Sequence, residues 1–140
     1  MIQTPKQKKA LNAAAYVKGY MGNNGKYGCA AVVQVTGKKK KVIKDSGSAK
    51  GKTQIYPEYK AMMMALDECV KQGCTKVTVK TNFKALDDHA ANQPKTPEGK
   101  QYYANIEARR KKINISISRV AAKAEPLLKE ACDTAKQLVK

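Results

Sequence analysis

Two β-type segments joined by a glycine- and asparagine-rich turn constrain the fold of this chain more than any other feature. Residues 15–20 are followed by the turn Gly22-Asn23-Asn24-Gly25 and then by residues 27–33, a more apolar segment that continues to about residue 35. Asn and Gly tolerate positive φ angles, so the turn favours a β-hairpin between the two segments. The sequence therefore predicts a domain that is organised around an antiparallel pair of strands.

The balance of charges indicates what kind of partner the domain has. The 140 residues are enough for one domain with its own core. They include 28 Lys and Arg against 11 Asp and Glu, which gives a net charge of +17. Such a balance favours a polyanionic partner, because the positive charges repel one another in the isolated protein. Lysines that only aid solubility are the alternative, but they usually come with a comparable number of glutamates.

The cysteines argue against zinc and for a reducing compartment. The four cysteines form no C-x-x-C pair, and the single His89 is remote from them in sequence, so zinc ligation is not expected. Cys29 falls in an apolar strand, while Cys69 and Cys132 fall on apolar helix faces, which is typical of buried, reduced thiols. The chain shows no apolar signal region and no run of membrane-spanning length. We therefore expect a cytoplasmic protein that has no membrane partner.

The remaining segments extend the hairpin into an α/β domain. Further strands are expected near residues 40–44, 76–81 and 113–118, with a flexible loop over residues 45–53. Helices are expected over residues 57–71, 83–91 and 97–112, and from residue 125 onwards. The order β-β-β-α-β-α-α-β-α predicts a mixed five-stranded sheet with helices on both faces. We expect residues 1–12 to form a basic N-terminal arm and residues 13–140 to form the domain.

This order of elements resembles the ribonuclease H family, and most closely its clostridial and bacillar type. The resemblance extends from Ala15 to Val139. It rests on the Tyr-Gly step that opens the second strand and on the spacing of four residues in the first helix, namely Glu58, Ala61, Ala65 and Leu66. It implies a ribonuclease H-like fold. In that family, carboxylates at four positions hold two metal ions that hydrolyse the RNA strand of an RNA–DNA hybrid.

The resemblance also implies that the family's catalytic carboxylates are largely replaced. The four corresponding residues here are Lys18, Glu58, Asn82 and Cys132. Hard divalent cations need oxygen ligands. A unit positive charge about 4 Å from such an ion costs roughly 8 kcal/mol at an effective dielectric constant near 20. We therefore expect no enzymatic activity, no metal and no other cofactor, with the Lys18 ammonium paired to the Glu58 carboxylate.

Four basic clusters are the expected nucleic-acid contacts: the N-terminal arm, the tip of the second hairpin, the loop that follows it and the end of the third helix. Their residues are Lys6, Lys8, Lys9, Lys38, Lys39, Lys40, Lys41, Lys50, Lys52, Arg109, Arg110, Lys111 and Lys112. Contacts on several sides suit structured RNA, which is recognised by shape and phosphate. The favoured hypothesis is an inactive RNA-binding protein of a ribonucleoprotein such as the ribosome, where the partner is ribosomal RNA. An RNA–DNA hybrid is the other nucleic-acid partner considered.

Two further functions stay open at the level of sequence. The first is a divergent, metal-dependent ribonuclease H that uses Glu58, Asp133 and Asp45 on RNA–DNA hybrids. Cleavage of a hybrid with Mg²⁺ or Mn²⁺ identifies it. The second is an interaction module whose lysines contact an acidic protein. Co-purification with and without nuclease treatment separates this module from a nucleic-acid-binding protein.

Overall fold

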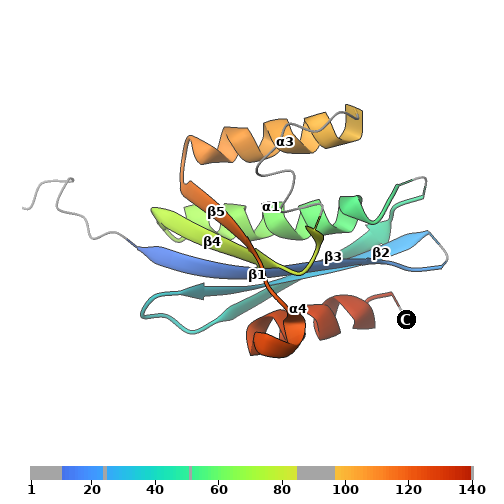
Figure 1. Cartoon of the computed structure of the whole chain (residues 1–140), viewed down its shortest axis with the longest axis horizontal. Helices are drawn as coiled ribbons and strands as arrows, with labels where there is room; N and C mark the ends of the chain where they lie inside the picture. The colour runs from blue at the N-terminus through green and yellow to red at the C-terminus, as the bar shows by residue number, and fades with distance from the viewer. Residues whose placement is uncertain (1–10, 24, 51, 85–96, 140) are drawn as a thin grey trace, which may run out of the picture.

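A single mixed sheet with helices on both faces forms the domain. The computed structural model describes residues 11–23, 25–50, 52–84 and 97–139. Helices α1 and α3 lie on one side of the sheet and α4 lies on the other (Figure 1). The strands are β1 (Asn12–Met21), β2 (Lys26–Val35), β3 (Lys41–Ser48), β4 (Lys76–Thr81) and β5 (Asn114–Arg119). The helices are α1 (Ile55–Lys71), α3 (Pro97–Arg110), the 3₁₀ turn η2 (Ala122–Ala124) and α4 (Pro126–Gln137).

The connections between the strands determine their directions. The order across the sheet is β3-β2-β1-β4-β5, in which β1, β2 and β3 are antiparallel neighbours. Strands β4 and β5 run parallel to β1. Parallel neighbours need long crossovers, and α1 and α3 lie within these connections. The predicted mixed five-stranded α/β sheet with helices on both faces is confirmed. Most of the helix predicted over residues 83–91 lies outside the described residues.

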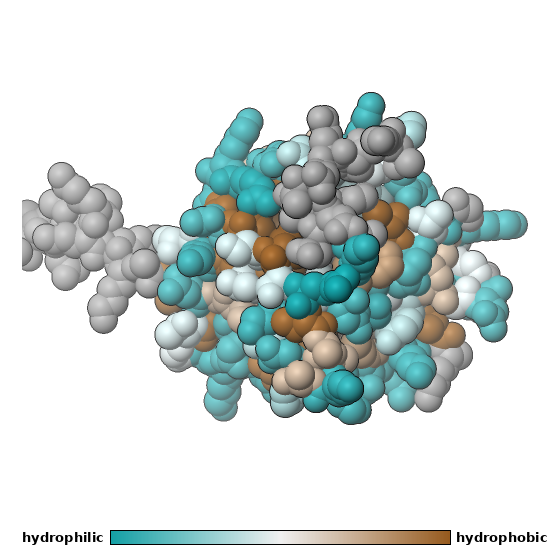
Figure 2. Space-filling view, in the orientation of Figure 1, coloured by the Kyte–Doolittle hydropathy of each residue, from teal (hydrophilic) through white to brown (hydrophobic). Residues whose placement is uncertain are grey.

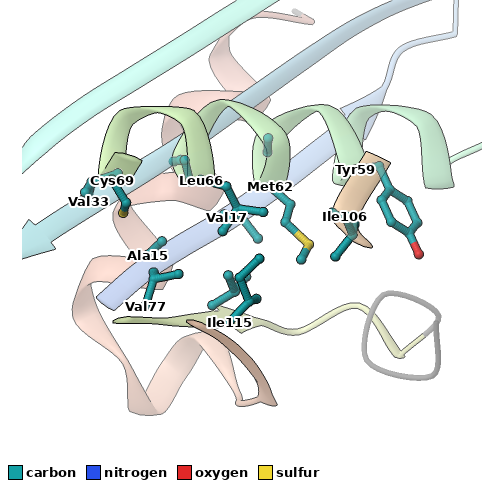
Figure 3. Close-up of a cluster of buried hydrophobic side chains, with 14 of the residues drawn as sticks. Ala15, Val17, Val33, Tyr59, Met62, Leu66, Cys69, Val77, Ile106 and Ile115 are labelled. Atoms are coloured by element: carbon teal, nitrogen blue, oxygen red, sulfur yellow. The ribbon is translucent and has the colours of Figure 1, made fainter. Parts of the chain in front are cut away.

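Strand β1 is buried on both sides because its alternate residues face different helices. Ala15 and Val17 belong to the larger core beneath α1, together with Met62 and Leu66 of that helix (Figure 3). Tyr16 belongs to a smaller cluster beneath α4. A strand with two apolar faces forms the centre of a sheet, which explains why the opening hairpin carries so few polar residues.

Strand β3 is longer than its sequence predicts. Residues 45–48 were expected in a flexible loop, yet they continue the ladder with β2, where Ser46 pairs with Gly28 and Ser48 with Lys26. Gly47 lies against the ring of Tyr27, since a Cβ atom at Gly47 would be 3.2 Å from the Tyr27 Cε1 atom. Pairing with a long, regular β2 therefore outweighs the low strand propensity of Gly and Ser.

Candidate functional site

A buried ion pair lies where the end of β1 meets the start of α1. The Lys18 Nζ atom is 2.6 Å from the Glu58 Oε2 atom. The Glu58 side chain is fully buried and that of Lys18 is 11% exposed. Burial raises the pKa of the Glu58 carboxyl above its ordinary value, while the contacts with Lys18, Gln54 and the Gly19 amide oppose that rise. The sequence-based pairing of Lys18 with Glu58 is thus present in the fold.

Glycine at position 19 allows β1 to approach α1 closely enough for this pair to form. A Cβ atom at Gly19 would lie 2.3 Å from the Pro57 carbonyl carbon, so no larger residue fits. The Gly19 amide donates to the Glu58 Oε1 atom at 3.0 Å. Gln54 donates its amide hydrogens both to Glu58 and to the Gly19 carbonyl. The carboxylate therefore has three donors, and each of them depends on the close approach of strand and helix.

Sequence reasoning missed Gln54 and Tyr20 as parts of this site. Gln54 precedes α1 in the loop, and nothing in the local pattern marks it. The Lys18 ammonium lies 5.1 Å from the centroid of the Tyr20 ring and 5.6 Å from that of Phe83, within the range of cation–π attraction. Only the glycine after Lys18 could have indicated a close backbone contact.

The fold brings Cys132 close to the ion pair and leaves Asn82 at its edge. Burial raises the pKa of the Cys132 thiol, and the Lys18 ammonium opposes that rise, so the thiol on α4 lies within electrostatic reach of the pair. Asn82 is exposed just beyond the end of β4. The parallel register pairs Tyr16 with Lys80, so two residues further along Asn82 comes opposite Lys18. No hydrogen bond joins Asn82 to Lys18 or Glu58.

These four positions, with the side chains that they carry, do not fit a pair of divalent cations. They supply one carboxylate, and an ammonium at 2.6 Å already neutralises it. The other two residues offer a thiol and an exposed amide, while Mg²⁺ prefers several oxygen ligands. Within the described residues, no group of three or more His, Cys, Asp or Glu side chains is placed to hold a metal ion.

The acidic residues of the divergent-nuclease hypothesis are not brought together either. Asp133 lies on the exposed side of α4, 3.1 Å from the Lys129 Nζ atom. Asp45 accepts a hydrogen bond from the Tyr27 hydroxyl and lies 3.4 Å from Lys60. Each of these carboxylates therefore has its own partner, as Glu58 has Lys18.

Two of the predicted basic clusters gather at one end of the sheet, which we call the basic end. It consists of Lys38–Lys41, in and after the β2–β3 turn, and Arg109–Lys112, at the end of α3 and in the turn that follows it. Both clusters lie next to the last turns of α1, where Lys41 pairs with Glu68 and Arg109 pairs with Asp67. Lys50 and Lys52 lie at the opposite end, after β3, where Lys50 is next to Gly25 of the β1–β2 turn and Lys52 is 3.8 Å from Glu98. Lys6, Lys8 and Lys9 lie outside the described residues.

The basic clusters differ in how many of their charges are already matched by acids. Within the described part of the chain, five of these cations form ion pairs: Lys40, Lys41, Lys52, Arg109 and Arg110. Five others are exposed and have no ion-pair partner among those residues: Lys38, Lys39, Lys50, Lys111 and Lys112. The second set can contact phosphate without first breaking an ion pair to another described residue.

The helices of the described residues include none that is long and apolar enough to cross a membrane.

Sequence comparisons find no relative, whereas structural comparison does. No protein-family model matches the chain, and no curated protein sequence is significantly similar to it. The ribonuclease H1 structure of the archaeon Halobacterium salinarum superposes with a TM-score of 0.78 at 16% identity, over 91% of this chain and 96% of that one. The N-terminal ribonuclease H domain of rv2228c from Mycobacterium tuberculosis gives 0.71 at 22% identity, over 92% and 99%. LC11-RNase H1 in complex with an RNA/DNA hybrid gives 0.74 at 18% identity, over 91% and 96%.

These likenesses confirm the predicted ribonuclease H-like fold and correct one expectation. The prediction that the chain is not an enzyme is contradicted, because its structural neighbours are ribonuclease H enzymes. That prediction rested on the residue types at four aligned positions, and it set Asp87, Asp88 and His89 aside because adjacent residues of a helix point in different directions. Asp87, Asp88 and His89 lie outside the described residues, so the four positions are not a complete inventory of donors.

Proposed function

We propose that the chain binds nucleic acid that contains RNA, either an RNA–DNA hybrid or structured RNA, through its ribonuclease H-like domain. One observation carries the proposal. The fold resembles that of a ribonuclease H1 solved in complex with an RNA/DNA hybrid, and in this chain the basic end of that fold bears exposed lysines that have no acidic partner among the described residues. Hydrophilic side chains project around the rim of the molecule in Figure 2. A ligand with regularly spaced negative charges matches this distribution.

We assign the phosphate contacts to the exposed lysines that form no ion pair with other described residues. Lys38 and Lys39 flank one side of the α1 C-terminus, and Lys111 and Lys112 flank the other. Each neutralised phosphate of a duplex contributes about −0.9 to the slope of log affinity against log salt concentration. The paired residues Lys41 and Arg109 contribute less, because contact with a phosphate costs them their bonds to Glu68 and Asp67.

The narrower proposal is that the RNA belongs to a ribonucleoprotein such as the ribosome, in the cytoplasm. Exposed lysines that form no ion pair with other described residues occur at both ends of the sheet, Lys50 at one and Lys111 at the other, which suits a domain enclosed by folded RNA. Free, buried thiols such as Cys29 and Cys69 suit a reducing compartment. Co-sedimentation with ribosomes that is abolished by ribonuclease supports this proposal, and sedimentation of the tagged chain as a free protein at physiological salt contradicts it.

Hydrolysis of the RNA strand of a hybrid is the second candidate function, and the likeness to ribonuclease H enzymes favours it. A labelled hybrid incubated with the purified chain and Mg²⁺ or Mn²⁺ tests this candidate. Metal-dependent cleavage that Glu58→Gln abolishes would establish it, because Glu58 is the carboxylate that the ion pair holds at the site. Cleavage that persists in Glu58→Gln assigns the activity to other residues or to a contaminant.

The binding proposal is tested by the salt dependence of affinity. The double variant Lys111→Gln with Lys112→Gln should lower the magnitude of the salt slope by about two phosphate contacts, which is roughly 1.8. The matched control neutralises Lys100 and Lys136, which are equally exposed on α3 and α4 but lie outside the clusters. Equal slopes for both variants contradict the assignment of these residues. A wild-type chain that binds no hybrid and no structured RNA at low salt contradicts the function itself.

A further inference from the structure

Helix α4 covers only part of its face of the sheet. It packs on β1 and β2, and more weakly on β3, and no extensive contact joins it to β4 or β5 within the described residues. On β4 and β5 the odd-numbered residues Val77, Val79 and Ile115 are buried in the core beneath α1. Because side chains alternate along a strand, the even-numbered residues point to the other side, where α4 is missing. Six side chains lie on this side, on a surface that we call the open sheet face. Lys76, Asn114 and Ser116 are exposed, and Thr78, Lys80 and Ser118 are half-buried.

The register of the two strands arranges the open sheet face as three rows. Lys76 lies beside Asn114, Thr78 beside Ser116, and Lys80 beside Ser118. Neighbouring strands are about 4.8 Å apart and alternate residues about 6.6 Å apart, so the rows form a regular grid of polar groups. Beneath the grid, the β4 backbone is paired with strands on both sides, β1 and β5, whereas β5 is the edge strand of the sheet and pairs with β4.

Most of these polar groups have no partner within the part of the chain that the structure describes. Among the described residues, no side-chain hydrogen bond is formed by Thr78, Asn114, Ser116 or Ser118, and no ion pair is formed by Lys76. Lys80 lies over the Tyr16 ring at 5.5 Å and is 3.3 Å from the Glu125 carboxylate. The face thus carries hydroxyl, amide and ammonium donors, with a net positive charge.

The open sheet face is continuous with the basic end of the molecule. A groove of about 480 Å³ lies where α3 passes into β5, and it is lined by Thr75 and residues 110–115. Asn114 belongs both to this groove and to the first row of the grid. The Arg110 guanidinium donates to the Ile115 carbonyl at 2.8 Å, which fixes one wall of the groove, while Lys111 and Lys112 remain exposed on its rim.

We propose that the open sheet face binds the sugar–phosphate backbone of a single RNA strand that enters through this groove. Ammonium and hydroxyl donors recognise phosphate oxygens, and Asn114, Ser116 and Ser118 also offer acceptors for the ribose 2′-hydroxyl. Recognition through stacked bases is not available, because Tyr16, the aromatic residue at this position, is only 9% exposed beneath Lys80. The inference rests on the proposed RNA binding and adds a second ligand segment on the face opposite α1.

The test compares two double variants that carry the same pair of substitutions, one on strands β4 and β5 and the other on strand β3. Lys76→Glu with Ser116→Glu places two acids on the open sheet face. Lys44→Glu with Ser46→Glu makes the same substitutions at exposed positions of β3, on the same side of the sheet. The two variants therefore have the same net charge and the same change in strand propensity. The affinity for a short, mixed-sequence single-stranded RNA is measured by fluorescence anisotropy at low salt, alongside the affinity for an RNA–DNA hybrid.

The open-face variant should bind single-stranded RNA at least about tenfold more weakly than the β3 variant, with a salt slope smaller by about 0.7 for each lost contact. Ultraviolet cross-linking of the wild-type chain should place the RNA on β4 and β5, and this readout decides the matter if the variant does not fold. Equal losses in both variants, or cross-links elsewhere, overturn the inference. If the inference is overturned but the wild-type chain still binds the RNA–DNA hybrid, the proposed function stands. A wild-type chain that binds neither single-stranded RNA nor the hybrid refutes the proposed function. Competition by polyglutamate but not by RNA would assign the face to an acidic protein and would also overturn the inference.

Discussion

Replacing Lys18 with methionine tests whether the buried ion pair stabilises the fold. Methionine keeps the length of the side chain and removes the charge. It leaves the Glu58 carboxylate fully buried, with only the Gln54 and Gly19 donors. Removing one partner of a buried ion pair typically costs about 3–5 kcal/mol. Protonation of Glu58 limits this loss, because protonating a carboxyl of pKa about 4.3 at pH 7 costs roughly 3.7 kcal/mol. We therefore expect Lys18→Met to lower the free energy of unfolding at pH 7 by about 3–4 kcal/mol.

Because protonation of Glu58 limits the loss of stability in Lys18→Met, the loss should depend on pH. In Lys18→Met, burial without the counter-charge holds the folded pKa of Glu58 above its unfolded value. Such a group favours the folded state below the unfolded pKa, and this advantage is lost as the pH rises through the folded pKa. The difference between Lys18→Met and the wild type should therefore be smallest near pH 4 and largest at neutral pH.

A second ion pair in the same molecule provides the control. Lys40 and Glu130 are also 2.6 Å apart, but their side chains are 47% and 34% exposed, against 11% and 0% for Lys18 and Glu58. Exposed pairs contribute about 0–1 kcal/mol. Double-mutant cycles by urea denaturation, with methionine for each lysine and glutamine for each glutamate, should give a coupling energy that is several times larger for the buried pair. Equal coupling in the two cycles, or a loss below about 1 kcal/mol for Lys18→Met at pH 7, would refute the reasoning.

Two further substitutions test the geometry around the pair. Gly19→Ala places a methyl group 2.3 Å from a backbone carbon of α1 and should lower the free energy of unfolding by about 3 kcal/mol or more. The control is Gly37→Ala, at φ +81° with nothing within 4 Å, which should cost only about 1–2 kcal/mol in the same urea assay. Similar losses in the two variants would contradict the close approach of β1 and α1. A triple variant with Lys18→Asp, Asn82→Asp and Cys132→Asp brings three new carboxylates near that of Glu58. Its thermal stability should fall without metal and recover in millimolar Mg²⁺. A melting temperature that does not respond to Mg²⁺ would show that the four positions do not converge on one site.

Periodicity predicted most of the fold because the strands that carry the core alternate or are wholly apolar. Strand β4 is observed at its predicted bounds, residues 76–81, since Val77 and Val79 alternate with polar residues. The end of β3 could not be predicted in this way. Residues 45–48 contain no apolar side chain, and they are held in the sheet by backbone bonds to β2. Contacts made by the backbone of a distant segment leave no pattern in the local sequence.

The candidate site shows the same limit for charged residues. The sequence predicted the partnership of Lys18 and Glu58 only through the family resemblance. It could not separate Lys41, which bonds Glu68, from Lys39, which has no ion-pair partner within the described residues. That separation depends on how α1 lies across the sheet, although both lysines belong to one run in the sequence. A basic cluster read from sequence therefore overestimates the charge that is available to a ligand.

The strength of the buried ion pair connects the two candidate functions. Any cation that binds the Glu58 carboxylate must displace the Lys18 ammonium from its position 2.6 Å away. If the pair contributes about 3 kcal/mol, displacement weakens the affinity for that cation by more than a hundredfold, since each 1.4 kcal/mol is a factor of ten. Should the chain hydrolyse a hybrid through Glu58, Lys18→Met must lower the metal concentration needed for half-maximal cleavage by a similar factor, even though the variant is less stable. A metal requirement that does not change in Lys18→Met would show that hydrolysis does not use this carboxylate. The coupling energy from the double-mutant cycle therefore predicts how much Lys18→Met should lower the metal concentration needed for half-maximal cleavage. This prediction can be made before any nuclease assay.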